Sequence, residues 1–329
     1  MITKSSANNT FIRPQMFYII GLQEMPFAKC FYIFLSIVYI LTMFFNGFII
    51  VFIYFEQSLH SAKYIAVSHL ALADLCSSTA IIPKVIDTFL FNSNFITYEA
   101  CLANMFFVHF SSAIQSLSLV ILAYDRLIAI CLPLQYHSIN TCSRMKAIIV
   151  SIWLFCAALV SVMVLLITRL SFCQSTVINS FFCDHGPVYR LACNDFSPNI
   201  IMALITTALL LFLPMVFILF SYIAIGIALL KIASAEGRQK AIKTCVSHMI
   251  LVAIFYFPLV VIYGSSQFVN FHPNARILNS SLSSTIPPMI NPLIYTLKTE
   301  EMMDAIKNHL KRKLEKQSKP MINIRFLYQ

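Results

Sequence analysis

The chain has 329 residues, of which 59% are hydrophobic and only 11% are charged. Soluble domains carry about 25% charged residues, so this composition excludes an ordinary soluble protein and indicates one embedded in lipid. The net charge of +10 does not indicate a nucleic-acid partner, because the basic residues lie between and after apolar runs, where the cytoplasmic side of a membrane favours them. Six glycines are too few for a glycine-rich phosphate loop, and no nucleotide-binding or zinc-protease motif is present, so we expect neither an enzyme nor a metal site.

Seven apolar runs are long enough to cross a bilayer, which takes about 20 predominantly apolar residues. Proline inside several of them is compatible with membrane helices, because neighbouring helices can satisfy the freed backbone groups. We therefore predict an all-α membrane protein with one domain: an extracellular N-terminus (1–29), a seven-helix bundle (30–297) and a cytoplasmic tail (298–329). The runs cover roughly residues 30–55, 64–90, 102–131, 145–168, 199–230, 244–266 and 277–297.

Lysine and arginine set the orientation of this bundle. With the tail inside, sixteen of the 23 basic residues lie on the cytoplasmic side, as the positive-inside bias requires. Asn8 then opens an outward-facing Asn-Asn-Thr glycosylation sequon, and no cleavable signal peptide is evident. After the seventh run, apolar residues at helical spacing alternate with basic ones, which predicts a short amphipathic helix on the lipid surface.

An Asp125-Arg126 pair stands at the end of the third run. Ionisable residues are costly at a membrane boundary, so such a pair indicates a function. Asp125 can hold Arg126 in a resting arrangement that a conformational change releases. Residues 122–136 read Leu-Ala-Tyr-Asp-Arg-Leu-Ile-Ala-Ile-Cys-Leu-Pro-Leu-Gln-Tyr, a string that resembles the signature of olfactory receptors among the rhodopsin-like G-protein-coupled receptors.

Further strings carry the same resemblance, which extends from about residue 11 to residue 306. The seventh run ends in Asn-Pro-Leu-Ile-Tyr, whose proline leaves a hinge in a helix, and Lys-Ala-Ile-Lys-Thr-Cys-Val-Ser-His opens the sixth run. Within the family, a Cys-Asp-His triplet, a double proline and a Lys-Thr pair resemble the strings of the fish-like (class I) subgroup. The resemblance implies a conformational switch formed by Asp125, Arg126, Lys240, Asn291, Pro292 and Tyr295.

The implied function is that of an odorant receptor in the plasma membrane of olfactory neuron cilia. A small organic ligand would bind in the upper bundle and activate a heterotrimeric G protein of the stimulatory olfactory type, which raises cyclic AMP. A different rhodopsin-like receptor, for a peptide or an amine, is the alternative, although an amine receptor would usually have an acid near Val108. A secondary transporter would show an internal repeat, and none is found.

Asp74 lies midway along the second run, where a lone carboxylate needs a partner, an ion or a proton. Asn46, Gln115 and Asn291 are its expected partners. Together the four residues resemble the sodium and water site of this receptor class. Olfactory receptors commonly have Glu where this chain has Gln115, so a hydrogen-bonded polar cluster without sodium is the alternative.

Four cysteines fall on the outer side and allow three pairings, among which the residues alone do not choose. The resemblance implies Cys101–Cys183, which would tie the loop to the third helix as a lid, and Cys173–Cys193.

Residues that share faces at helical spacing near the outer end of the bundle predict a ligand pocket. His109 is its best polar candidate, and for each member the alternative is ordinary core packing. The set comprises Met105, Val108, His109 and Ser112 from the third run, Thr206 from the fifth, Tyr256, Leu259, Val260 and Tyr263 from the sixth, and Ser280 from the seventh.

Overall fold

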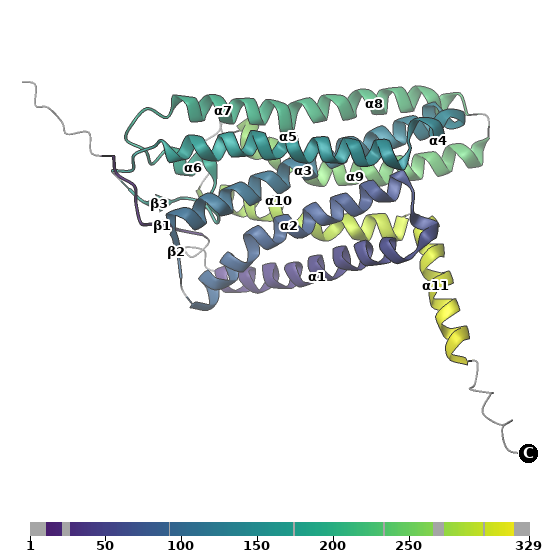
Figure 1. Ribbon diagram of the computed structural model, residues 1–329, viewed down its shortest axis with the longest axis horizontal. Helices are drawn as coiled ribbons and strands as arrows, with labels where there is room; N and C mark the ends of the chain where they lie inside the picture. Colours follow the sequence, from purple (N-terminus) through teal and green to yellow (C-terminus); the bar gives the residue numbers. More distant parts are fainter. Residues whose placement is uncertain are drawn as a thin grey trace, which may run out of the picture.

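The computed structural model describes residues 11–21, 27–91, 93–173, 175–232, 234–265, 273–298 and 300–318, and this part is mostly helical (Figure 1). Each predicted apolar run coincides with a long helix whose bounds differ by a few residues, except that α9 begins earlier, at Ala235. The long helices are α1 (Ala28–Phe55), α2 (Ala62–Phe91), α3 (Tyr98–Cys131), α5 (Cys142–Thr168), α7 (Ser197–Thr207), α8 (Leu213–Leu230), α9 (Ala235–Ser265), α10 (Pro273–Lys298) and α11 (Glu300–Ser318).

Six helices of the described part are long and apolar enough to cross a membrane. They are α1, α2, α3, α5, α9 and the rod formed by α7 and α8, which a π-helical turn at Ala208–Phe212 joins. Serine, asparagine and proline interrupt the apolar residues of α10, which packs against α1, α2 and α9 inside the bundle. A helix surrounded by protein needs less apolar surface than one that faces lipid.

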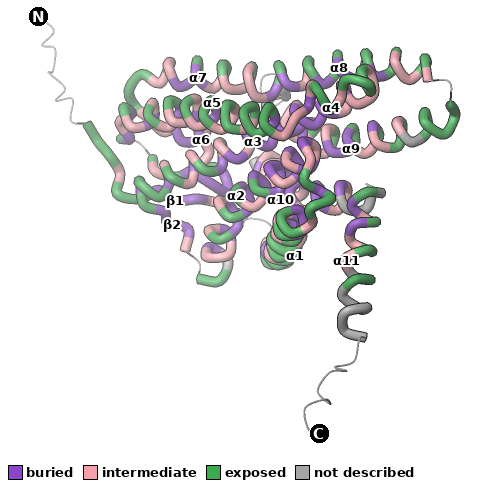
Figure 2. The backbone as a smooth tube through the Cα atoms, turned by 45° about the vertical axis from the view of Figure 1, so that its right-hand side comes forward, coloured by how far each residue is buried: buried purple, intermediate pink, exposed green. Residues whose placement is uncertain are grey.

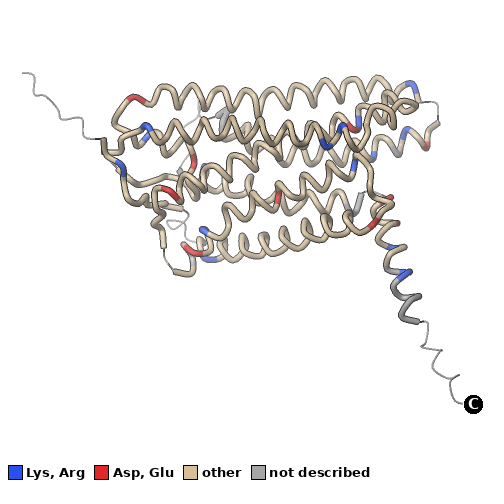
Figure 3. The backbone as a smooth tube through the Cα atoms, in the orientation of Figure 1, with Lys and Arg blue, Asp and Glu red and all other residues tan. Residues whose placement is uncertain are grey.

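Apolar residues of the bundle are exposed as well as buried, and Figure 2 shows exposed and buried positions along the same helices. Phe44, Leu154 and Phe220 are 65%, 68% and 65% exposed, whereas Asn46 and Asp74 are fully buried. Large apolar patches on a surface mark contact with a partner or a membrane. Figure 3 shows charged residues mostly toward the two ends of the bundle and along α11, which leaves an apolar belt between them.

Two prolines show how the bundle tolerates broken helical hydrogen bonds. Pro214 and Pro292 have no N–H for the carbonyl four residues earlier, and in each case a neighbouring helix supplies the donor. The Ser116 hydroxyl of α3 donates to the carbonyl of Leu210. Asn46 Nδ2 of α1 donates to the Pro288 carbonyl at 2.9 Å. These polar side chains therefore fasten α3 to the α7–α8 rod and α1 to α10.

A small sheet closes the end of the bundle opposite α11, here called the sheet end (Figure 1). Strand β1 (Met16–Ile19) lies in its centre, antiparallel to β2 (Phe95–Thr97) and parallel to β3 (Val177–Ile178). Phe17 and Ile19 of β1 are buried in an apolar cluster that also includes Tyr98. The central strand comes from the N-terminal segment and the two outer strands come from loops between helices.

Candidate functional site

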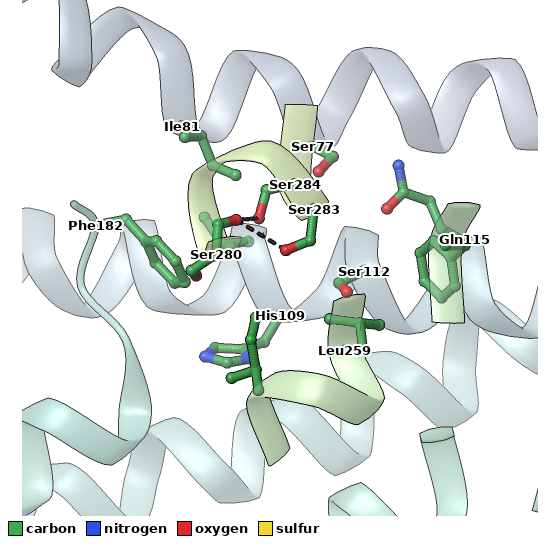
Figure 4. A pocket seen from close by; sticks show the side chains of 13 residues that line it. Ser77, Ile81, His109, Ser112, Gln115, Phe182, Leu259, Ser280, Ser283 and Ser284 are labelled. Atoms are coloured by element: carbon green, nitrogen blue, oxygen red, sulfur yellow. Dashed lines mark hydrogen bonds between the residues drawn. The ribbon is translucent and has the colours of Figure 1, made fainter. Parts of the chain in front are cut away.

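A cavity lies between α2, α3, α9 and α10 near the sheet end (Figure 4). The structure brings five predicted pocket residues to it: Val108, His109, Ser112, Leu259 and Ser280. The cavity reaches α2 and α10 further than the sequence predicted, and its other lining residues are Ser77, Ile81, Gln115, Phe182, Phe255, Ile262, Ser283 and Ser284.

Four predicted pocket residues do not line this cavity. Met105 is buried in the cluster formed with α5 and the long loop, and Val260 packs in the core cluster nearer the centre of the bundle. The Thr206 hydroxyl donates to the Met202 carbonyl of its own helix at 2.9 Å. Tyr256 is buried, and its hydroxyl lies 2.8 Å from Ser116 Oγ. The Tyr263 side chain lies outside the described part of the chain. Helical spacing found the right faces of α3 and α10 but placed the cavity too close to α7.

The loop between α5 and α7 covers the cavity. Disulfides join Cys101 to Cys183 and Cys173 to Cys193, the pairing that the resemblance implied. The first bond ties the loop to the start of α3, next to Phe182, whose ring lines the cavity. The predicted link between the loop, here called the lid, and α3 is therefore confirmed, while its action as a lid stays a prediction.

A close contact between His109 and Asp184 adds a second link between the lid and α3. His109 Nε2 lies 3.3 Å from Asp184 Oδ1. Burial alone would raise the pKa of Asp184, but His109, Arg276 and His185 outweigh it and lower that pKa below its usual value. Burial lowers the pKa of His185 to about 4, with the charge of His109 as a further cause. The lid thus holds the ionised carboxylate of Asp184 next to His185, which is neutral at pH 7.

Asp74 forms the polar centre beneath the cavity. Its Oδ1 accepts from Gln115 Nε2 at 2.7 Å and its Oδ2 accepts from Asn291 Nδ2 at 2.9 Å. Asn46 was expected here, but its amide nitrogen donates instead to the carbonyls of Thr42 and Pro288, the latter left free by Pro292. Both amides donate N–H groups to Asp74, as the hydrogen-bonded alternative expects, and sodium binding stays a prediction. No cluster of three or more metal-binding side chains occurs among the described residues.

The Asp125-Arg126 pair lies at the opposite end of α3. Arg126 Nη1 is 3.6 Å from Asp125 Oδ2, and the two side chains are 11% and 0% exposed. Asp125 Oδ1 also accepts from Tyr136 Oη and Asn140 Nδ2, both at 2.7 Å. Tyr136 begins the short helix α4 (Tyr136–Ile139) and Asn140 follows it. These two anchors were not predicted, although Tyr136 belongs to the quoted signature string.

Other contacts hold the same end of the bundle closed. Tyr222 Oη lies 2.7 Å from His248 Nδ1, and His248 Nε2 lies 3.2 Å from the Leu119 carbonyl, so α9 is linked to both α8 and α3. Tyr295 of α10 is buried, and its hydroxyl makes no hydrogen bond to the described residues. The side chain of Lys240 and the whole of Asn8 lie outside the described part.

Helix α11 leaves the bundle beyond α10 (Figure 1). Glu301 accepts from Lys63 Nζ at 2.8 Å and from Tyr64 Oη at 2.9 Å, which anchors its start to α2. Met302 and Ala305 are buried against the bundle, whereas contact of this helix with the lipid surface stays a prediction. The helix therefore has one face on protein and one face free.

Comparison with known proteins agrees with this architecture. The family model described as "Olfactory receptor" matches residues 35–313. Human olfactory receptor 1M1 is 34% identical over 306 residues, which are 92% of this chain and 96% of that receptor. Mouse olfactory receptor 7A40 is 34% identical over 299 residues (90% and 96%), and human olfactory receptor 51E2 is 36% identical over 275 residues (82% and 84%). Receptors of this family are not enzymes. The chain therefore belongs to the olfactory receptor family of rhodopsin-like (class A) G-protein-coupled receptors, multi-pass membrane proteins that bind odorants and couple to G proteins.

Proposed function

We propose that this receptor binds its odorant in the cavity of Figure 4 and activates a stimulatory, olfactory-type G protein that raises cyclic AMP. One observation carries the proposal. Gln115 lines the cavity and also donates to Asp74, which accepts in turn from Asn291 at the α10 hinge. A ligand that moves Gln115 therefore acts directly on the contact between α2, α3 and α10.

The proposed topology has seven spans in one domain, with α10 as the seventh. The sheet end and the N-terminus lie outside, where glycosylation at Asn8 would occur, and α11 lies on the cytoplasmic lipid surface. The charge bias of the loops supports this orientation. The plasma membrane of olfactory neuron cilia is the proposed location. The Cys-Asp-His triplet and the double proline support assignment to the fish-like (class I) subgroup.

Activation is a shift between populations, because a ligand moves an equilibrium only by its different affinities for the two states. In the resting state Asp125 holds Arg126, and His248 holds α9 against α3 and α8. An odorant that favours the open state repacks the helices around Gln115 and loosens these contacts. The exposed cleft, edged by Arg126 and Lys240, then accepts the G-protein α subunit.

The test is an odorant screen in cells that carry a cyclic AMP reporter, followed by variants of the cavity. Ser112→Ala and His109→Ala should each raise the half-maximal concentration of an identified agonist. A lost buried hydrogen bond costs about 1–3 kcal/mol, or roughly 5- to 150-fold in affinity. Thr206→Val is the matched control, because that hydroxyl donates within its own helix. If Ser112→Ala and His109→Ala both leave potency at the Thr206→Val level, the ligand binds elsewhere.

A further inference from the structure

The polar groups around the cavity differ in what they can offer a ligand. A serine hydroxyl has one hydrogen to donate and two lone pairs to accept with. The hydroxyls of Ser283 and Ser284 both donate to the Ser280 carbonyl, each at 2.9 Å (Figure 4). Their hydrogens are therefore committed to helix α10, and they present only oxygen lone pairs to the cavity.

Gln115 also presents a hydrogen-bond acceptor and no free donor to the cavity, but for a different reason. It is 96% buried (4% exposed), and its amide nitrogen is bound to Asp74. The oxygen of that amide consequently faces away from Asp74, toward the other labelled lining residues (Figure 4), and no hydrogen bond to it is found among the described residues. An amide oxygen can only accept. Gln115 therefore adds an acceptor to the cavity that the two serine oxygens also line.

The remaining polar lining does not reverse this balance. His109 Nε2 lies 3.3 Å from the Asp184 carboxylate, so that nitrogen is directed at the lid loop and not at the serine oxygens. The hydroxyls of Ser77, Ser112 and Ser280 have no described partner and can turn either way. Among the described lining residues there is no lysine or arginine. The Asp74 carboxylate lies close to the cavity, whereas Asp184 is offset by His109 and Arg276.

We infer that the ligand of this receptor is a small molecule whose polar end donates hydrogen bonds through O–H or N–H. An ether, ketone or ester would leave the oxygens of Gln115, Ser283 and Ser284 unpaired, and an unmade buried hydrogen bond is costly. A carboxylate would meet these oxygen lone pairs and has no hydrogen to donate to them. The inference rests on the proposed function, since it assigns the chemistry of the odorant in the same cavity.

The experiment uses the full receptor, purified in lipid nanodiscs, and measures the shift of its thermal unfolding midpoint with concentration of added probe. The probes each contain six carbon atoms and have similar lengths: 1-hexanol, hexylamine, hexanal, methyl pentyl ether and hexanoate. We expect 1-hexanol or hexylamine to bind on the order of tenfold more tightly than hexanal or the ether, and hexanoate to bind weakest. Whichever of the alcohol and the amine binds better decides between a neutral and a cationic donor.

Variants show whether this preference arises in the cavity. Ser283→Ala combined with Ser284→Ala should abolish the preference for the alcohol over the ether. Ser281→Ala is the matched control on the same helix, because Ser281 is buried away from the cavity and donates to the Leu278 carbonyl at 2.8 Å. It should retain the preference, which also controls for partitioning of the probes into lipid.

Three results would overturn the inference: equal binding of the ether and the alcohol, an unchanged preference in the double variant, or no binding of any probe. Failure of the proposed function would differ. In that case a donor probe would stabilise wild-type receptor and lose this effect in the double variant, yet raise no cyclic AMP in cells with receptor at the surface.

Discussion

Replacing Asp125 by Asn should strongly raise signalling in the absence of ligand. The side chains of Asp125 and Arg126 are 0% and 11% exposed, so they form a buried pair rather than a solvent-screened one. Removing one partner of a buried pair costs about 3–5 kcal/mol, because the other charge is left uncompensated. Asn keeps an acceptor for Tyr136 and Asn140, so the substitution acts mainly on the ion pair.

If the pair forms only in the resting state, its loss shifts the equilibrium toward the active state by about 150-fold or more. A receptor that is active in about one molecule in a hundred would then be active in more than half. The assay is basal cyclic AMP, divided by the amount of receptor at the cell surface.

Tyr136→Phe provides a graded comparison, because it removes one hydrogen bond from the Asp125 carboxylate and leaves the ion pair in place. A hydrogen bond to a charged group contributes about 1.5–3 kcal/mol, so its effect should be smaller than that of Asp125→Asn. Tyr124→Phe, the same change at the residue that precedes Asp125, is the control for loss of a tyrosine hydroxyl. Basal signalling of Asp125→Asn at the wild-type level, with normal surface expression, would refute the assigned restraint.

Two further predictions concern stability. With the lid closed, the pKa of His185 is about 4, below its usual value of about 6.5. Between these two values only the opened lid binds a proton, so the free energy that favours the closed lid decreases as pH falls from about 6.5 to about 4. At pH 5 the closed lid should have lost about 2 kcal/mol of stability relative to the open lid. Hydrogen exchange of the lid, corrected for intrinsic rates, should show this loss in wild type and not in His185→Gln. Asn46→Leu should lower the thermal midpoint by leaving the Pro288 carbonyl unpaired, at about 1–3 kcal/mol. The penalty should shrink in a Pro292→Ala background, where residue 292 regains its N–H, and equal penalties in both backgrounds would contradict this role of Asn46.

The sequence predicted the helices well because hydropathy and length report burial in lipid directly. It predicted contacts less well wherever two segments distant in sequence determine them. Asp74 was correctly paired with Gln115 and Asn291, since buried amides and a carboxylate have few other partners. Asn46 was misassigned because the competing acceptor is a backbone carbonyl, which every residue has and which becomes available only through Pro292.

The cavity was partly predicted for a related reason. Helical spacing gives the face that a residue occupies but not the depth or direction of the space beside that face. Ser283 gave no signal beyond being a polar residue in an apolar run, and Thr206 gave the same signal although its hydroxyl donates within its own helix. The three-stranded sheet was not expected, because strands of two to four residues carry almost no periodicity.

The order of strands in that sheet has a practical consequence for modified receptors. Because β1 lies in the centre, β2 and β3 pair with it and not with each other in the described structure. A truncation or fusion that replaces residues 16–19 would remove every strand pairing at once and disconnect the two loops. The backbone of Ile12 already forms hydrogen bonds with Ser171 and Phe172 of the lid loop. Epitope tags and export sequences should therefore be inserted before Phe11.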